Sequence, residues 1–254
     1  MANIADIEEI VQTWAWTAFQ KTRSKDVSKL KLEDVRLDVN WSRVRFITSQ
    51  PEFSDGRMVE MPNSQVVFTS TFVNNTDQEQ EHSFKTERTT TSVSTVTVSK
   101  GYSKGFNLEL KLALPEEVAA VTAGFGREVN MDNTEESCHE ESITWAVDST
   151  VRVPAKHTTT AEMVVKEKQF TSSYKMSVRI RGIVIVSVLN LKDNNSFVQS
   201  TEGDFSVIMA DELKRGRSGY QVENKTVIFN VEGSCKFRFG VEQKVQLKEK
   251  PIED

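Results

Sequence analysis

The chain has 254 residues, enough for one large or two modest domains with a real core. Charged residues make up 27% and hydrophobic residues 37% of it, a composition typical of a soluble, folded protein. The formal net charge of −5 argues against general nucleic-acid binding. No apolar run approaches the ~20 residues that a transmembrane helix needs.

The N-terminal residues do not resemble a secretory signal. Residues 1–9 read Met-Ala-Asn-Ile-Ala-Asp-Ile-Glu-Glu, without a basic region and with acids between the apolar residues. Cys138 and Cys235 are too few for a disulfide scaffold. We expect a soluble protein that is made without a signal peptide, stays cytoplasmic or is released by lysis, and has reduced thiols. A redox-sensitive bridge within or between chains is the alternative.

Residues 4–20 have the apolar spacing of a helix. Ile7, Val11 and Trp14 share one face, which predicts packing on the body of the protein. A second interpretation concerns three tryptophans near the N-terminus, because aromatic side chains are frequent interface anchors. They would form a receptor-contacting surface, and they are Trp14, Trp16 and Trp41.

Alternating apolar residues predict strands over residues 30–47, followed by a loop over 51–62. The segment 66–100 then runs for 35 residues without Gly or Pro, and 14 of these are Ser or Thr. Thr and Val favour strands, yet the segment is too polar to be buried on both faces. We expect one very long, solvated and twisted strand, bent near residues 74–77.

Residues 104–128 form an amphipathic hairpin when they are paired across a tip between Pro115 and Glu116. Side chains alternate along a strand, so Leu112 faces Ala119 and one face of the ribbon is apolar. That face consists of Phe106, Leu108, Leu110, Leu112, Leu114, Val121, Ala123 and Phe125. The polar or small face carries Asn107, Glu109, Lys111, Thr122 and Glu128. Lys104 and Arg127 form a basic pair on the apolar side of the ribbon, at the open end of the hairpin.

This hairpin has the dimensions of a membrane-spanning one. A transmembrane β-strand needs roughly 9–11 residues, with apolar side chains towards lipid and aromatic ones at the interface. Lys104 and Arg127 would then lie at headgroup level, and the polar face would line a pore. The alternative is an ordinary sheet that packs on a soluble core.

The remaining chain is mostly strand-like. Two more polar tracts cover 130–153 and 156–181, and a buried strand is predicted over 183–191. Further strands are predicted over residues 207–213, 227–231 and 235–245, with a basic loop at 214–219 and a loose charged tail from 247. The fold class is therefore mainly β, with a short N-terminal helical region.

No catalytic or metal-binding pattern stands out. His82, His139 and His157 lack metal-ligand spacing, and neighbours in Cys138-His139-Glu140-Glu141 point to opposite faces of a strand. Phosphate loops, nucleophile elbows and zincin motifs are missing. We expect a protein that is not an enzyme and uses no cofactor or metal.

Long Ser/Thr-rich strands on both sides of a short amphipathic hairpin resemble the aerolysin-like β-pore-forming proteins, specifically the epsilon-toxin/mosquitocidal-toxin family. The resemblance covers about residues 66–186. Besides the hairpin, it is carried by Phe72-Val73-Asn74-Asn75, the tract through Lys100-Gly101-Tyr102, Trp145, Val151-Arg152-Val153-Pro154 and Ile180-Arg181-Gly182.

The resemblance implies an elongated body of long twisted antiparallel strands. Residues 1–65 would form the receptor-binding region and residues 66–254 the pore-forming module. Members are soluble monomers or dimers that assemble into rings, commonly heptamers, on a target-cell membrane. Their hairpins then close into a transmembrane barrel, and many members are activated by loss of a terminal segment. The receptor would be a glycan, a lipid or a protein.

Two functions from different classes follow. The first is a pore-forming protein that binds a membrane, oligomerises, inserts its hairpins and permeabilises cells. The second is a non-lytic carbohydrate- or lipid-binding β protein that keeps the same body. Dye release distinguishes them, because only the first function opens a membrane.

Overall fold

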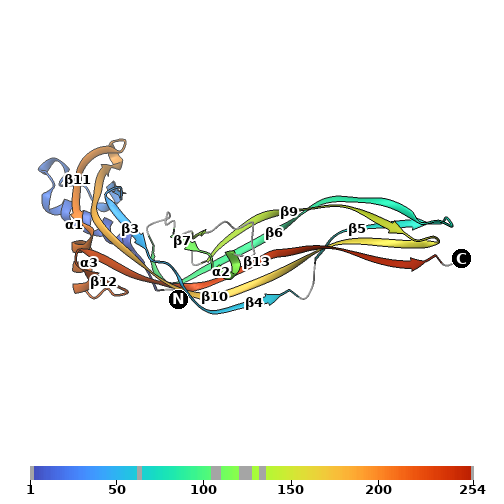
Figure 1. Ribbon diagram of the computed structural model, residues 1–254. Coiled ribbons are helices and arrows are strands. Elements are labelled where there is room, and N and C mark those ends of the chain that lie inside the picture. The colour runs from blue at the N-terminus through green and yellow to red at the C-terminus, as the bar shows by residue number, and fades with distance from the viewer. Residues whose placement is uncertain (1–2, 62–64, 104–109, 120–127, 132–135, 253–254) are drawn as a thin grey trace.

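The computed structural model describes residues 3–61, 65–103, 110–119, 128–131 and 136–252. The molecule is elongated, with a head that holds the two longer helices at one end and long strands that run away from it (Figure 1). The predicted class, a mainly β fold with an N-terminal helix, is confirmed.

Strands make up most of the described chain. In chain order they are β1 (Asn3–Asp6), β2 (Val35–Asn40), β3 (Val44–Thr48), β4 (Glu52–Glu60), β5 (Gln65–Asn74), β6 (Gln80–Ser103), β7 (Leu110–Ala113), β8 (Glu128–Met131), β9 (Glu136–Val153), β10 (His157–Asn190), β11 (Ser196–Asp204), β12 (Tyr220–Glu223) and β13 (Thr226–Pro251). The helices are α1 (Ile7–Thr22), α2 (Glu116–Ala119) and α3 (Phe205–Lys214), with short 3-10 turns η1 (Lys25–Val27), η2 (Leu32–Asp34) and η3 (Leu191–Asp193).

The strand β10 is the spine of the molecule. Along one edge it pairs in turn with β5, β4, β3 and β2, and along the other with β13 and then β11, always antiparallel. Two strands predicted over 156–181 and 183–191 are therefore one strand of 34 residues. It passes from the body into the head at Gly182, whose φ of +134° a residue with a side chain rarely adopts.

The head is a three-stranded sheet, β2–β10–β11, covered on one face by α1 and α3. Val184, Val186 and Val188 are fully buried on that face, as the alternation in β10 predicts. Asp6 begins α1 as its N-cap, because its carboxylate accepts hydrogen bonds from the N–H groups of Glu8 and Glu9.

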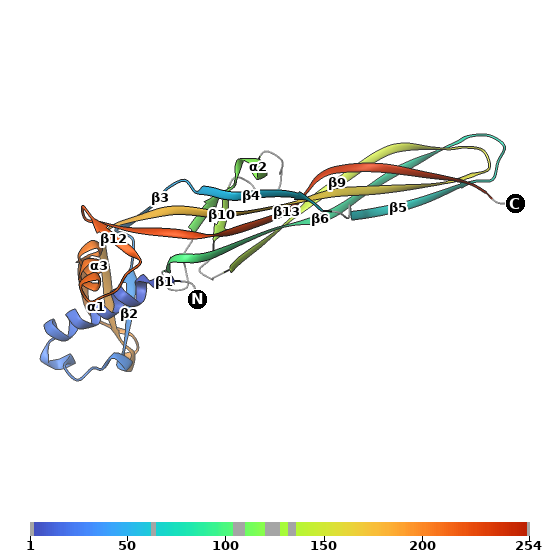
Figure 2. The ribbon, with the colours of Figure 1, turned by 90° about the horizontal axis from the view of Figure 1, so that it is seen from below.

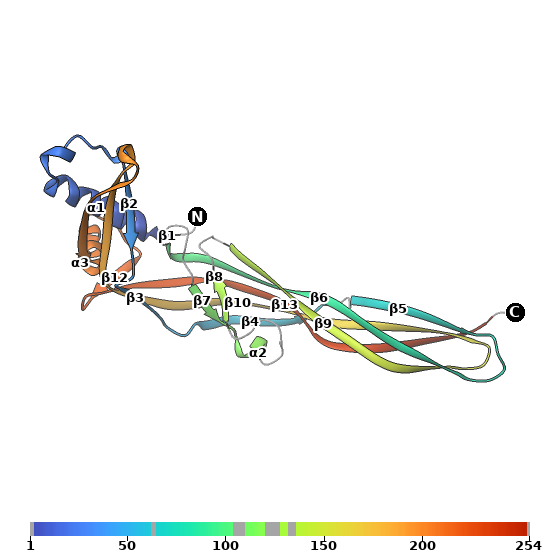
Figure 3. The same ribbon diagram turned by 90° about the horizontal axis from the view of Figure 1, so that it is seen from above.

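The far end of the body has two layers. The β6–β9 ribbon pairs through its outer half with nothing else in the described chain, and it lies over β5, β10 and β13 (Figures 1 and 3). Phe84, Val151, Val153, Ala161 and Met163 are buried between these layers.

A buried amide closes this end of the body. The side-chain nitrogen of Asn74 lies 2.8 Å from the carbonyl oxygen of Gln78 and 3.0 Å from those of Val153 and Pro154. Because Asn74 is fully buried, these bonds compensate for the water that it has lost. Two short motifs noted in the sequence therefore meet at Asn74, which belongs to the first of them. They are Phe72-Val73-Asn74-Asn75 and Val151-Arg152-Val153-Pro154.

Several sequence predictions about elements are wrong. Residues 66–100 are not one bent strand, because β5 ends at Asn74 and the chain reverses direction before β6 (Figure 3). The loop predicted over 51–62 is mostly strand β4, which pairs with β10. The tail predicted to be loose continues β13 to Pro251 and pairs with the start of β10.

The strand predicted over residues 207–213 is helix α3. Asp204 caps it by accepting a hydrogen bond from the N–H of Ser206, and Phe205, Ile208 and Met209 lie on its buried side. A short apolar run fits a strand and a buried helix equally well, so the apolar pattern alone could not distinguish a helix from a strand here. The capping aspartate was the signal that identifies the helix.

Candidate functional site

The described part of the hairpin segment lies beside the long strands of the body. Strands β7 and β8 form a separate two-stranded sheet, and one helical turn, α2, follows β7 (Figures 1 and 2). The segment thus makes no backbone pairing with the large sheet in the part of the chain that is described. Its described part can therefore move away from the body without breaking the backbone hydrogen bonds of the large sheet.

The described residues of the apolar face are turned towards the protein interior. Leu112 is fully buried, and Leu114 and Val129 are 8% and 5% exposed. Val118, which lies in the turn α2 and was not part of the predicted apolar face, is also fully buried. All four belong to the main hydrophobic cluster, which also contains Phe237 of the body. Removing such side chains from water stabilises the protein by roughly 1.5–3 kcal/mol for each fully buried Leu or Val.

The polar face points to solvent where it is described. Lys111 and Glu128, both predicted to line a pore, are 60% and 56% exposed and form an ion pair across β7 and β8 with an N–O distance of 3.9 Å. An exposed pair of this kind contributes about 0–1 kcal/mol. It does little to hold the segment in place.

The pairing inside this segment differs from the expected one. Leu112 pairs with Val129 and Lys111 with Asn130, whereas a tip between Pro115 and Glu116 would have paired Leu112 with Ala119. Ala119 instead ends the helical turn α2. Periodicity identifies the faces of a ribbon, but any shift by an even number of residues preserves them, so the expected partner was wrong.

The strands that flank the segment keep one long, regular register. β6 pairs with β9 over 18 consecutive residues, from Gln80 with Val153 to Thr97 with Glu136, and no bulge interrupts them. Beyond this end of the ladder β6 continues to Ser103, and Glu136 is the first residue of β9.

Other hairpin residues singled out in the sequence lie outside the described residues. They are Lys104, Phe106, Asn107, Leu108, Glu109, Val121, Thr122, Ala123, Phe125 and Arg127. Leu110 is described as the first residue of β7.

The three tryptophans are partly buried in the head. Trp14 packs next to Gly203, Trp16 lies 5.5 Å from Phe19 between ring centroids, and Trp41 contacts Phe205 edge to face at 5.7 Å. Their contribution to the head core is clear, and their role as receptor anchors stays a prediction.

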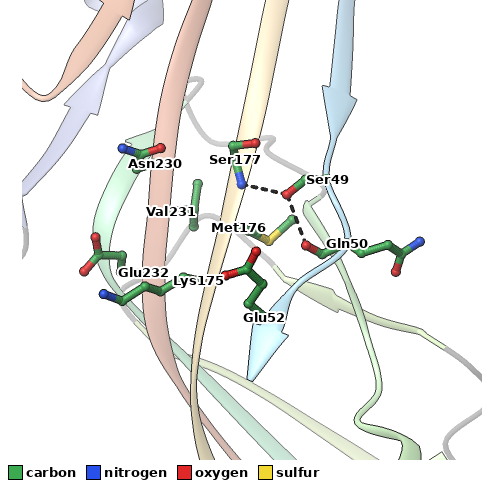
Figure 4. A pocket seen from close by; sticks show the side chains of 9 residues that line it. All are labelled: Ser49, Gln50, Glu52, Lys175, Met176, Ser177, Asn230, Val231 and Glu232. Atoms are coloured by element: carbon green, nitrogen blue, oxygen red, sulfur yellow. Dashed lines mark hydrogen bonds between the residues drawn. The ribbon is translucent and has the colours of Figure 1, made fainter. Parts of the chain in front are cut away.

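The body also has a surface cavity of about 520 Å³ where β3 gives way to β4 (Figure 4). It is lined by Ser49, Gln50, Glu52, Lys175, Met176, Ser177, Asn230, Val231 and Glu232. The backbone N–H of Ser177 donates to the Ser49 hydroxyl at 2.9 Å, which ties the connection between β3 and β4 to β10. Three distant segments line the cavity, so no sequence pattern indicated it.

The described residues contain no group of three or more His, Cys, Asp or Glu side chains that could hold a metal ion. His82 stacks on Phe72 with 5.0 Å between ring centroids, which is a packing role. Cys138 is exposed and Cys235 is buried, and neither is in a disulfide. None of the helices that the structure describes has both the length and the apolar character that crossing a membrane requires.

Comparison with solved structures identifies relatives of the whole fold. A non-toxic crystal protein from Bacillus thuringiensis superposes with a TM-score of 0.56 at 15% identity, covering 98% of both chains. The Mpp75Aa1.1 β-pore-forming protein from Brevibacillus laterosporus matches at a TM-score of 0.49 and 11% identity, covering 96% of this chain and 87% of the other. A comparison with curated protein sequences finds no match.

The family is decided by the sequence itself. The profile of the Clostridium epsilon toxin ETX/Bacillus mosquitocidal toxin MTX2 family matches residues 36–254, which include all strands from β3 to β13. The chain therefore belongs to the Clostridium epsilon toxin ETX/Bacillus mosquitocidal toxin MTX2 family.

Proposed function

We propose that the protein binds a target membrane, assembles into a ring and inserts the hairpin at residues 104–128 as its share of a transmembrane β-barrel. The observation that carries the proposal is the burial of Leu112, Leu114, Val118 and Val129 against the body by a segment that shares no ladder with the large sheet in the described chain. Leu112, Leu114 and Val129 of the apolar face are thereby kept away from water. Their release breaks side-chain contacts with the body and the β7–β8 pairing, and leaves the described part of the large sheet intact.

The physics of the bilayer requires assembly at or before insertion. A single hairpin in lipid would leave the N–H and C=O groups of its edges unpaired, so only a closed ring of hairpins can span. Relative to exposure to water, lipid burial of about ten apolar side chains per hairpin is worth of order 10–20 kcal/mol per chain, which offsets the burial in the body that these side chains give up. This is comparable to the whole stability of a typical domain.

The proposal includes a definite change of register. If the β6–β9 ladder extends without a slip, the frame that pairs Thr97 with Glu136 pairs Leu112 with Val121. In the structure, Leu112 pairs with Val129, so insertion moves its partner by eight residues. Eight is even, so every side chain keeps its face, and Lys111 stays on the polar side.

A pair of disulfides tests this register change. In an Ala113→Cys, Glu128→Cys variant, oxidation joins two residues that pair in the structure and separate in the inserted frame. We expect the oxidised protein to release less than about a tenth of the dye that the wild type releases from cells or liposomes, and the reduced protein to recover. Cys138→Ser is included in each variant to prevent mispairing.

The matched control joins two exposed residues of the flanking ladder. A Thr89→Cys, Thr144→Cys disulfide links residues that pair both before and after the proposed change. It is expected to leave dye release unchanged. Full activity of the oxidised Ala113→Cys, Glu128→Cys protein would show that this segment does not re-pair.

We also propose that the head, with α1, β2 and β11, recognises the target, and that the long strands form the pore-forming module. The head holds the β2–β10–β11 sheet and its helices, away from the two-layered end of the body (Figure 1). This modifies the boundary expected at residue 65, because β11 and α3 come from the C-terminal half of the chain.

A non-lytic binding function is the second candidate. The Bacillus thuringiensis relative with the same fold is described as a non-toxic crystal protein, so this fold also occurs in a protein described as non-toxic. Under that function the wild-type protein would bind its target without dye release, and the disulfides would change nothing. Dye release by the wild type decides between the two.

A further inference from the structure

The far end of the head exposes a group of apolar side chains. Phe197 is 63% exposed, Leu32 is 54% exposed and Leu191 is 48% exposed. Phe197 has the largest exposure of any large apolar side chain in the described chain. We call these three residues the tip patch.

Two turns bring the tip patch to one place. Leu191 belongs to η3, at the turn between β10 and β11, and Phe197 follows it on β11. Leu32 belongs to η2, just before β2. An ion pair of 2.7 Å between the Asp34 carboxylate and the Lys192 ammonium joins η2 to η3. Figures 2 and 3 show the β10–β11 turn beside the start of β2.

Phe197 does not contribute to the hydrophobic core of the head. On the covered face of the head sheet, Val35 and Val188 are buried against Phe19 of α1. Phe197 pairs with Leu189 and therefore lies on the opposite face, where no described helix packs. An exposed apolar group on an otherwise charged surface commonly marks an interaction site.

The surroundings of the tip patch are basic. Residues 21–36 and 191–197 together hold seven Lys or Arg and four Asp or Glu, although the whole chain has a net charge of −5. Lys25, Lys29, Lys31 and Lys192 are all exposed there, and two of them also lie beside a carboxylate, Lys31 at 3.5 Å from Glu33 and Lys192 at 2.7 Å from Asp34. Apolar side chains with a basic rim are complementary to a surface of anionic lipid, which offers negative headgroups above a hydrocarbon layer.

We propose that the tip patch docks on anionic phospholipid, with Phe197, Leu32 and Leu191 entering the interface and the lysines on headgroup charges. The inference rests on the proposed function, because it names the part of the head that first contacts the target membrane. Each lysine at such a surface is worth about fivefold in affinity at low salt, so the contact is weak for one chain and strong for a ring.

Vesicle sedimentation tests the docking. The protein is held in its soluble register by the oxidised Ala113→Cys, Glu128→Cys disulfide, so insertion does not add to binding. Vesicles contain either phosphatidylcholine alone or phosphatidylcholine with about 30% phosphatidylserine. We expect binding to the mixed vesicles alone, with a loss of at least about tenfold when NaCl rises from about 0.1 to about 0.5 M.

Variants locate the contact. Phe197→Ser with Leu32→Ser, and separately Lys29→Gln with Lys31→Gln, are each expected to weaken binding at least about tenfold. Val207→Ser is the matched control, because Val207 is 57% exposed on α3, away from the tip patch, and its change should leave binding intact. Circular dichroism melts establish that all variants are folded.

The outcomes separate this inference from the pore-forming function. Equal binding of the tip variants and wild type, or no binding of the wild type to phosphatidylserine vesicles, overturns the docking proposal. So does binding to cells that protease or glycosidase treatment abolishes while the tip variants bind normally, since the partner is then a protein or a glycan. Binding through the tip patch without dye release by the unlocked protein would leave docking intact and contradict pore formation.

Discussion

Gly182 shows how one residue decides the junction between head and body. A Cβ atom there would lie 2.1 Å from the Arg43 carbonyl oxygen and 2.9 Å from the Val44 Cα. Both contacts are with backbone, which cannot rotate away. The residue lies between the body-facing and head-facing parts of the longest strand, β10, so the whole molecule depends on its conformation.

Gly182→Ala is therefore expected to lower the free energy of unfolding by about 2–4 kcal/mol, from the unfavourable φ and the clash together. Gly216→Ala is the control, because Gly216 also has a positive φ, +97°, but no heavy atom lies within 4 Å of the position that an added Cβ atom would occupy. It should cost about 1–2 kcal/mol. Urea unfolding of both variants measures the difference, and equal losses would contradict the argument from the clash.

At the scale of an element, the hairpin is defined by its two faces. The described apolar residues Leu112 and Val129 are buried, and Lys111 and Glu128 are exposed, as the alternation predicts. The alternation did not predict that Leu112 pairs with Val129, because the pairing register depends on the conformation of the turn and on packing against the body. Helix α3 is a different case, since tertiary packing selected one of two structures that its apolar run permits.

The lipid-facing residues of this element can be tested directly. In Leu108→Lys, Leu110→Lys, two charges replace side chains that would face the hydrocarbon, where a basic residue costs about 2–4 kcal/mol at the midplane of a barrel. We expect dye release to fall at least about 100-fold while binding to the target is kept. Glu109→Gln with Lys111→Gln, on the polar face, is the control and should still permeabilise. Dye release by the double lysine variant at the wild-type level would be incompatible with the assignment.

At the scale of the whole molecule, several buried titratable groups act together at high pH. Burial raises the pKa of the Cys235 thiol to about 12, and burial also raises the pKa of Tyr102, Tyr174 and Tyr220. Between about pH 9 and 12 the unfolded chain loses protons that the folded chain keeps. Stability is therefore complete below about pH 9 and declines as the pH rises.

We expect the melting temperature to fall steadily from about pH 9 to about pH 11, with little change between about pH 7 and 8.5. Iodoacetamide at about pH 9 should modify the exposed Cys138 of the native protein and leave Cys235 unmodified until denaturant is added. A Cys138→Ser variant isolates the second thiol. Rapid modification of native Cys235 in that variant would show that the thiol is not protected by burial.

The sequence by itself determined the class of fold, the long polar strands, the faces of the described part of the hairpin and the family, because periods of two and Ser/Thr-rich composition are local properties of the chain. Only the tertiary structure decided that β10 is a single spine through Gly182, that Asn74 closes the far end of the body, and that Leu112 pairs with Val129. These depend on contacts between segments far apart in the chain, and local patterns carry no information about which segments will meet.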